Sequence, residues 1–441
     1  MTAATRRFGL MFLAATALVA PALVAPAIAA DVQLPDNSWT GWHVGAGGGY
    51  GMVNHNLSLD LFGTIEASLK GIGGEGALGT VEAGYDFELG SGFVLGSLVD
   101  YTYSGISTDL SGNIFGTDVD YELEATHQLS ALVRVGHLAN DTTLMYSLGG
   151  YTYTRWNGDL SASGGVDESY DYSTDGLTIG GGIENVIADN ITLKLEHRMT
   201  FNGTQNIIEV PGLVDLNEKA HVQTARVVLS YRPGVQAAAF DGSESQWTGF
   251  HVGAGFGYSM LNHELEADVP GFAAAEFSGV GGEGLLGTLE AGADMLVGDR
   301  FVVGLQGGLT LTNAKTTADV DVPGLFTADY ELAAKYSFDV LGRAGLLTGP
   351  DVLWYGLAGW TRTRFEGDLD VNGASLASYK YDLDGLTVGG GVEVMLTDNV
   401  SWKTEYRYTN YEKETIADFG NGSLDSKSNQ QSVRSVLSLR F

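Results

Sequence analysis

The residues with the greatest potential for chemistry are charged side chains that recur at every second position. In the stretch from Ile191 to Met199, one face carries apolar residues and His197, and the other carries Thr192, Lys194, Glu196 and Arg198. A second stretch carries, at the matching positions, Ser401, Lys403, Glu405 and Arg407. A period of two is typical of a β-strand, whose successive side chains point to opposite faces. Exposing a charged side chain to hydrocarbon costs free energy, so we expect these side chains to point inward in a closed sheet.

Further charged residues are assigned to this inward face by parity, that is, by lying an even number of residues from a position that faces inward on the same strand. They are Glu82, Arg134, Glu184 and Arg226, and their counterparts are Glu290, Arg343, Glu393 and Arg434. A barrel of eight strands is only wide enough for its own side chains to fill. We therefore favour paired, hydrogen-bonded plugs over the other interpretation of these charges, a narrow or gated ion path.

Catalytic and cofactor chemistry find little support in the sequence. The nearest approach to a hydrolytic pair is His55 with Asp60, and the same spacing returns in His263 with Asp268. The sequence contains neither an H-E-x-x-H pattern nor a serine in a nucleophile elbow. Its glycine-rich runs are not opened by a βαβ unit, and its acidic loop residues do not match the spacing of a calcium-binding loop. We predict that the protein is not an enzyme and uses no metal or cofactor, with a lipid hydrolase as an alternative.

The chain is a tandem duplication. Residues 226–232 (RVVLSYR) match residues 434–440 (RSVLSLR) at a spacing of 208, and residues 71–86 match residues 279–294 at the same spacing. Repeats of about 200 residues are whole domains, because solenoid units recur at about 20 to 50 residues. The predicted organisation is therefore a first domain at residues 31–232, a linker of small and polar residues at 233–246, and a second domain at 247–441.

Within each copy the hydrophobic pattern has a period of two rather than 3.6, which predicts strands. In the first copy we expect eight, at residues 41–51, 75–89, 93–104, 121–138, 143–156, 176–188, 191–202 and 222–232. Tight turns between them alternate with long polar loops near residues 52–74, 105–120, 157–175 and 203–221. This layout predicts an all-β protein of two tandem eight-stranded antiparallel transmembrane β-barrels. One barrel of sixteen strands is the alternative.

The leader and the overall charge define the expected compartment. Residues 1–30 combine an arginine pair, a short apolar run and a small-residue stretch, which predicts a signal peptide cleaved after Ala29 or Ala30. Cysteine is absent from the chain, so disulfides and thiolate metal sites are excluded. The formal net charge of −31 would repel phosphate backbones, which argues against nucleic acid as a partner.

Three motifs that occur in the same order in both copies carry a family resemblance. Residues 39–47 (WTGWHVGAG) answer residues 247–255 (WTGFHVGAG), and the segment Asp384–Tyr411 begins with DGLTVGGG, which answers residues 175–182. The third is the closing strand, one face of which holds Val433, Leu437, Leu439 and Phe441. These features resemble the porin-family, opacity-type (OmpA-like) eight-stranded outer-membrane barrels of Gram-negative bacteria.

The resemblance implies a cell outer-membrane location and a role in envelope integrity or surface interaction, with a porin-like diffusion channel as the alternative. It implies outer-membrane lipid and lipopolysaccharide as surroundings, and periplasmic chaperones and the barrel-assembly machinery as partners. Because that machinery reads a terminal aromatic strand, the resemblance gives the closing strand the role of a C-terminal assembly signal. It names no surface ligand.

Overall fold

The computed structural model describes residues 38–114, 117–163, 165–210, 213–239, 246–269, 273–418 and 423–441. The predicted signal peptide, residues 1–30, lies outside the described residues. The strands of the first copy are β1 (Gly41–Leu61), β2 (Ile65–Glu88), β3 (Phe93–Ile114), β4 (Thr117–Asn140), β5 (Thr143–Ala162), β6 (Val166–Ala188), β7 (Ile191–Asn202), β8 (Gln205–Val210) and β9 (Val214–Tyr231). Those of the second copy are β10 (Gly249–Val269), β11 (Ala273–Val297), β12 (Phe301–Thr312), β13 (Lys315–Val322), β14 (Phe326–Gly349), β15 (Val352–Val371), β16 (Ala374–Thr397), β17 (Val400–Tyr411), β18 (Glu414–Asp418) and β19 (Ser423–Arg440).

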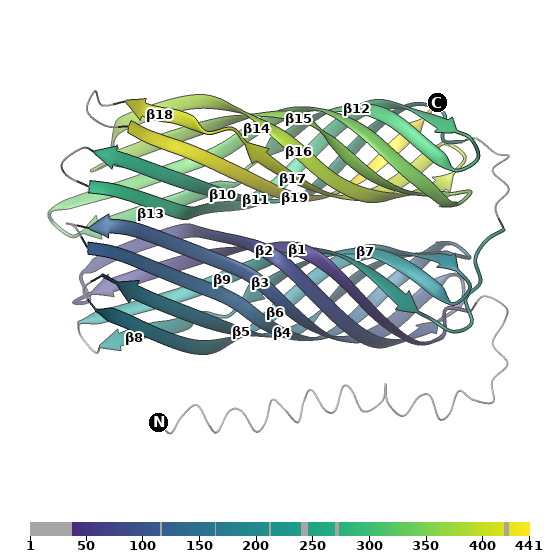
Figure 1. Cartoon of the computed structure of the whole chain (residues 1–441), viewed down its shortest axis with the longest axis horizontal. Helices are drawn as coiled ribbons and strands as arrows, with labels where there is room; N and C mark the ends of the chain where they lie inside the picture. The colour runs from purple at the N-terminus through teal and green to yellow at the C-terminus, as the bar shows by residue number, and fades with distance from the viewer. Residues whose placement is uncertain are drawn as a thin grey trace, which may run out of the picture.

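Each copy closes on itself through antiparallel pairing of consecutive strands. In the first copy the last strand, β9, pairs back with β1 from Val44↔Tyr231 to Leu61↔Val214. In the second copy β19 pairs back with β10 from His251↔Arg440 to Asp268↔Ser423. The two barrels lie side by side with their axes nearly parallel (Figure 1). This confirms the predicted fold of two tandem eight-stranded barrels. Each copy counts eight strands because β8 continues β7, β13 continues β12 and β18 continues β17, each pair lying along the same neighbouring strand.

The two faces of the strands differ as the period of two predicts. Outward-facing apolar side chains form a belt around each barrel, and examples are Val81, Leu129, Leu177, Leu289, Leu305 and Leu386, which are between 48% and 62% exposed. Among the described residues, no helix is long and apolar enough to cross a membrane. The exposed apolar side chains of the belt are the surface that matches a hydrocarbon core.

The predicted long polar loops are instead continuations of the strands, so those predictions were wrong. Strands β1 and β2, for example, remain paired as far as Leu61↔Ile65, and only residues 62–64 form the turn. The physical reason is that every backbone N–H and C=O needs a partner, and continuing the ladder supplies one at each residue. Beyond the membrane both faces of a strand can contact water, so a polar sequence can continue the strand there.

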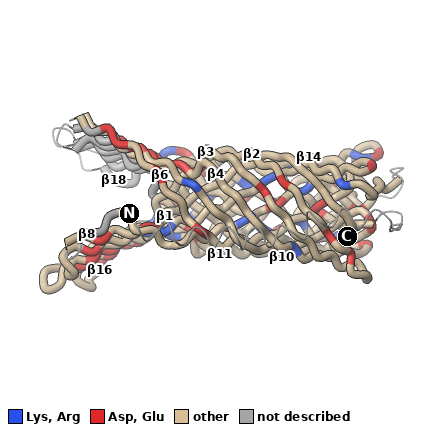
Figure 2. The backbone as a smooth tube through the Cα atoms, turned by 90° about the horizontal axis from the view of Figure 1, so that it is seen from below, with Lys and Arg blue, Asp and Glu red and all other residues tan. Residues whose placement is uncertain are grey.

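At the end where these long hairpins lie, which we call the extended end, the two barrels exchange strand partners. Strand β2 leaves β3 and pairs with β13, from Lys70↔Thr317 to Glu66↔Asp321. Strand β3 pairs with β11 at Gly112↔Ala275 and Ser111↔Glu276. The result is two sheets, β8-β9-β1-β2-β13-β14-β15-β16 and β18-β19-β10-β11-β3-β4-β5-β6, each with strands from both copies. Figure 2 shows them as two diverging arms, one bearing the β8 and β16 labels and the other the β6 and β18 labels.

Closure of the first barrel requires glycine on the inward face of β1. A Cβ atom at Gly49 would overlap the carbonyl oxygen of Ala225, which belongs to the backbone of β9 and cannot move aside. A Cβ atom at the neighbouring Gly48, on the outward face, would meet only the carbonyl oxygen of Leu78 at 3.4 Å, an ordinary contact. Close approach of two backbones is a common reason for glycine inside a strand.

We predict that Gly49→Ala lowers the free energy of unfolding by about 1–3 kcal/mol, as overpacking does. Gly48→Ala is the matched control and should leave it unchanged or slightly raised. The measurement is the urea midpoint in lipid vesicles, together with the folded fraction on unheated gels. Equal effects of the two substitutions would contradict the backbone-contact explanation.

Candidate functional site: the charged lumens

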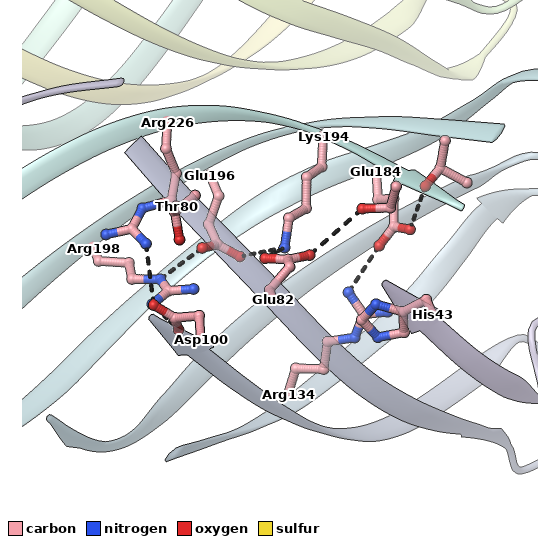
Figure 3. Close-up of polar contacts among 12 residues, drawn as sticks. His43, Thr80, Glu82, Asp100, Arg134, Glu184, Lys194, Glu196, Arg198 and Arg226 are labelled. Atoms are coloured by element: carbon pink, nitrogen blue, oxygen red, sulfur yellow. Dashed lines mark hydrogen bonds and ion pairs between the residues drawn. The ribbon is translucent and has the colours of Figure 1, made fainter. Parts of the chain in front are cut away.

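The first lumen holds two clusters of ion pairs, which we call central and terminal. In the central cluster, Lys194 Nζ lies 2.7 Å from Glu82 Oε2 and 3.5 Å from Glu196 Oε2 (Figure 3). Arg198 donates one hydrogen bond to Glu196 and one to Asp100, each at 2.6 Å. Arg226 lies 3.5 Å from Asp100. All six side chains are buried, so three cations neutralise three carboxylates away from water.

The terminal cluster lies where the chain enters and leaves the barrel. Arg134 forms a bidentate pair with Asp86 and a 2.8 Å ion pair with Glu184. Arg232, the residue after β9, lies 2.6 Å from Asp86 and 3.3 Å from Glu184. Its guanidinium stacks over the ring of Trp39 at 4.9 Å from the ring centre, and Trp39 is fully buried. Two cations again match two carboxylates, and the indole adds a cation–π contact to one of them.

The second lumen repeats both clusters with its own residues. Its terminal cluster pairs Arg343 with Asp294 and with Glu393 at 2.8 Å, and places Arg440 2.7 Å from Asp294 and over the ring of Trp247. Its central cluster joins Lys403 to Glu290, and Arg407 to Glu405 and to Asp339. Arg434 is buried beside them and donates hydrogen bonds to Thr310 and Ser432.

The structure places all fourteen residues of the predicted lumen network inside the barrels, where each is buried. Sequence reasoning missed four members of each network, namely Asp86, Asp100, Arg232 and His43 in the first and Asp294, Asp339, Arg440 and His251 in the second. Parity could have found some of them, because Asp86 shares the face of Glu82 and Arg232 shares the face of Arg226. Parity gives the face of a residue but not its cross-strand partner.

One carboxylate of the central cluster occupies different strands in the two copies. In the first barrel Asp100 of β3 stands opposite Ser130 of β4. In the second barrel the corresponding positions are Gly308 of β12 and Asp339 of β14, which also stand opposite each other. The carboxylate has thus moved to the paired position on the neighbouring strand, and it still reaches the same arginine, as Arg198 or as Arg407. Charge balance is therefore maintained although the residues differ.

The predicted hydrolytic pair does not form the contact that its spacing suggested. His55 is buried, and its Nδ1 atom is hydrogen-bonded to Glu218 rather than to Asp60. Tyr172 donates a hydrogen bond to the same carboxylate. Burial opposes ionisation of Glu218, but hydrogen bonds from His55 and Tyr172 hold the pKa of this carboxyl below its usual value.

In the second copy His263 contacts Ser428 at 2.6 Å, and the side chain of Asp268 lies outside the described residues. Among the described residues, no group of three or more histidine and acidic side chains is arranged to hold a metal ion.

The closing strand presents the expected face to the outside of the second barrel. Leu437, Leu439 and Phe441 are exposed there, whereas Val433 is buried. Phe441 exchanges two backbone hydrogen bonds with Phe250, of 2.8 and 3.2 Å, so the terminal aromatic residue completes the closure of the barrel.

Closed antiparallel barrels with apolar exteriors and ion-paired interiors define an integral outer-membrane β-barrel protein. The chain belongs to the outer membrane protein beta-barrel domain family, whose model matches residues 10–232 and again residues 233–441.

Two similar proteins are themselves named as outer-membrane proteins. The chain is similar to the 31 kDa outer-membrane immunogenic protein of Brucella melitensis biotype 1, with 28% identity over 207 residues that cover 44% of this chain and 84% of the relative. It is also 27% identical over 197 residues to the 22 kDa outer membrane protein of Rhizobium leguminosarum bv. viciae, covering 44% of this chain and 78% of that protein. Among solved structures, Neisserial surface protein A matches 44% of this chain and 98% of its own, with 16% identity and a TM-score of 0.24. The protein is located in the cell outer membrane.

We predict that Asp100→Gly destabilises the first barrel by about 3–5 kcal/mol. The substitution removes the carboxylate that pairs with Arg198 and Arg226 and leaves both guanidinium groups buried. The double variant Asp100→Gly, Ser130→Asp reproduces the arrangement of the second barrel and should restore most of the loss. The measurement is urea unfolding followed by tryptophan fluorescence in lipid vesicles. A double variant no more stable than the single one would contradict the carboxylate exchange.

Proposed function

We propose that the protein is a non-enzymatic component of the outer membrane that serves envelope structure and surface interaction, with both lumens closed by their own side chains. The observation that carries this proposal is the pair of charge-balanced clusters in each lumen. Their ion pairs join side chains of strands that lie across the barrel from one another, as in Lys194 of β7 with Glu82 of β2. An ion that crossed the lumen would have to separate such pairs in a buried environment, where losing one partner is costly.

The extended end supports the surface-interaction part of the proposal. Its two sheets project beyond the apolar belt and carry many acidic residues. One pocket of about 500 Å³ on this end includes Asp60, Glu66, Asp215, Asp319, Asp321 and Asp329 in its lining. Such a surface would be well solvated and would repel nucleic acid. We propose outer-membrane lipid and lipopolysaccharide as the surroundings of the belt, and the chaperones and barrel-assembly machinery as partners of the closing strand.

Conductance in planar bilayers tests the closed-lumen proposal. We expect no large, stable current steps from the intact protein. The variant Arg198→Ala, Arg407→Ala removes one cation from each central cluster and should raise the conductance if it folds, which heat-modifiable gel migration checks. Large stable steps from the unaltered protein would refute the proposal in favour of the porin alternative.

The non-enzymatic part has its own test. Because Nδ1 of His55 is hydrogen-bonded to buried Glu218, which also accepts a hydrogen bond from Tyr172, we expect no release of fatty acid from outer-membrane lipid. Release by the intact protein that is lost in both His55→Ala and His263→Ala would establish a hydrolase instead. A folded Ser130→Ala variant serves as a control for contaminating lipases.

A further inference from the structure

The two barrels touch through the same patch of surface on each copy. On the side of the first barrel, Ile183 and Leu195 pack with partly buried Met145. On the side of the second, Val392 and Val394 pack with partly buried Trp354. At the spacing of 209 that relates these segments, Ile183 corresponds to Val392 and Met145 corresponds to Trp354. Equivalent residues therefore face each other across the junction.

Burial shows that protein replaces lipid at this patch. Ile183 and Val392 point outward from β6 and β16, yet they are only 1% and 0% exposed. Four residues earlier on the same outward faces, Ile179 and Val388 are 48% and 45% exposed. The difference marks the part of each belt that the other barrel covers.

Polar contacts midway along the junction have the same symmetry. Glu75 of β2 accepts hydrogen bonds from Asn429 of β19 at 3.2 Å and from Tyr408 at 3.1 Å. Its counterpart at a spacing of 208, Glu283 of β11, is hydrogen-bonded at 2.6 Å to His221 of β9. His221 and Asn429 are themselves separated by 208 residues. In both directions, one carboxylate thus reaches the last strand of the other copy.

The strand exchange at the extended end completes the pattern. In the second copy, β13 corresponds to the last residues of β3 in the first copy, and β11 corresponds to β2. The two inter-barrel ladders, β2 with β13 and β3 with β11, are therefore related by a pseudo-two-fold axis. A patch that contacts its own equivalent is the mark of an isologous interface, as in a symmetric dimer.

We propose that this junction is a self-complementary docking surface whose partner is a second barrel of the same kind, so that the chain is a covalently linked dimer. The linker at 233–246 then supplies only local concentration, and the contacts themselves hold the barrels together. Specificity comes from the polar and backbone groups, because an apolar patch alone is equally satisfied by lipid. These groups are the Glu75 and Glu283 contacts, the edge ladders, and the 3.0 Å hydrogen bond from Ser68 to Asp319. The inference goes beyond the proposed function and does not depend on closed lumens.

Cleavage of the linker in the folded full-length protein tests the proposal. A protease site is placed between Ala239 and Gln246, and the protein is cut after insertion and extracted in mild detergent. We expect the two barrels to co-purify in a one-to-one ratio and to separate only on heating in strong detergent. Two barrels that separate on extraction in mild detergent after cleavage would overturn the proposal.

Engineered disulfides provide a second readout in the membrane, because the chain has no cysteine of its own. Ser68 and Asp319 stand directly opposite each other across the junction, so Ser68→Cys with Asp319→Cys should crosslink the cleaved halves on non-reducing gels. The control is Ser68→Cys with Asp370→Cys. Asp370 lies at the same level but two strands beyond Asp319, too far for a disulfide.

We expect at least ten times more crosslinked product from the facing pair than from the control pair. Equal yields, or no crosslink in a variant that folds by heat-modifiable migration, would contradict the strand exchange.

Discussion

Neutralisation of buried charge is the constraint on which both barrels depend. A lumen bounded by eight strands has no room for bulk water, so a cation inside it needs a carboxylate or another acceptor close by. The first barrel meets this need in two clusters, each with as many carboxylates as cations. The second barrel repeats these clusters, except that its Arg434 is hydrogen-bonded to Thr310 and Ser432. Glycine on the inward face of β1 belongs to the same constraint, because it leaves space for the long charged side chains and for the neighbouring backbone.

The two copies show which parts of the charged clusters can differ while the buried charges stay neutralised. The terminal clusters of the two copies are built from equivalent residues, with Asp86, Arg134 and Arg232 corresponding to Asp294, Arg343 and Arg440. The central clusters differ, because the carboxylate at Asp100 in one copy stands on the adjacent strand, at Asp339, in the other. Cross-strand neighbours are close enough for either position to serve the same arginine. Net charge within the cluster is therefore retained, and the strand that supplies it is free to change.

The exterior obeys a different rule from the lumen. Apolar side chains on the outward faces suit lipid and protein equally, so the junction between the barrels uses ordinary belt residues such as Ile183 and Val392. Beyond the belt, water replaces lipid and exposed strand edges need partners. There the two copies share their ladders and form two composite sheets, which diverge as two arms beyond the belt (Figure 2).

The sequence by itself determined that the chain is a duplication built of strands and which residues share a face of a strand, and it favoured two barrels over one of sixteen strands. The period of two separated Lys194, Glu196 and Arg198 from the apolar belt, and the repeat at 208 showed two copies. Only the tertiary structure decided the contents of the clusters, the extended hairpins and the barrel junction. Parity assigns a residue to a face, but its neighbours depend on the register and tilt of strands remote in sequence, as in Lys194 with Glu82. The junction was hidden for a related reason, because no local pattern distinguishes an apolar residue that meets lipid from one that meets another barrel.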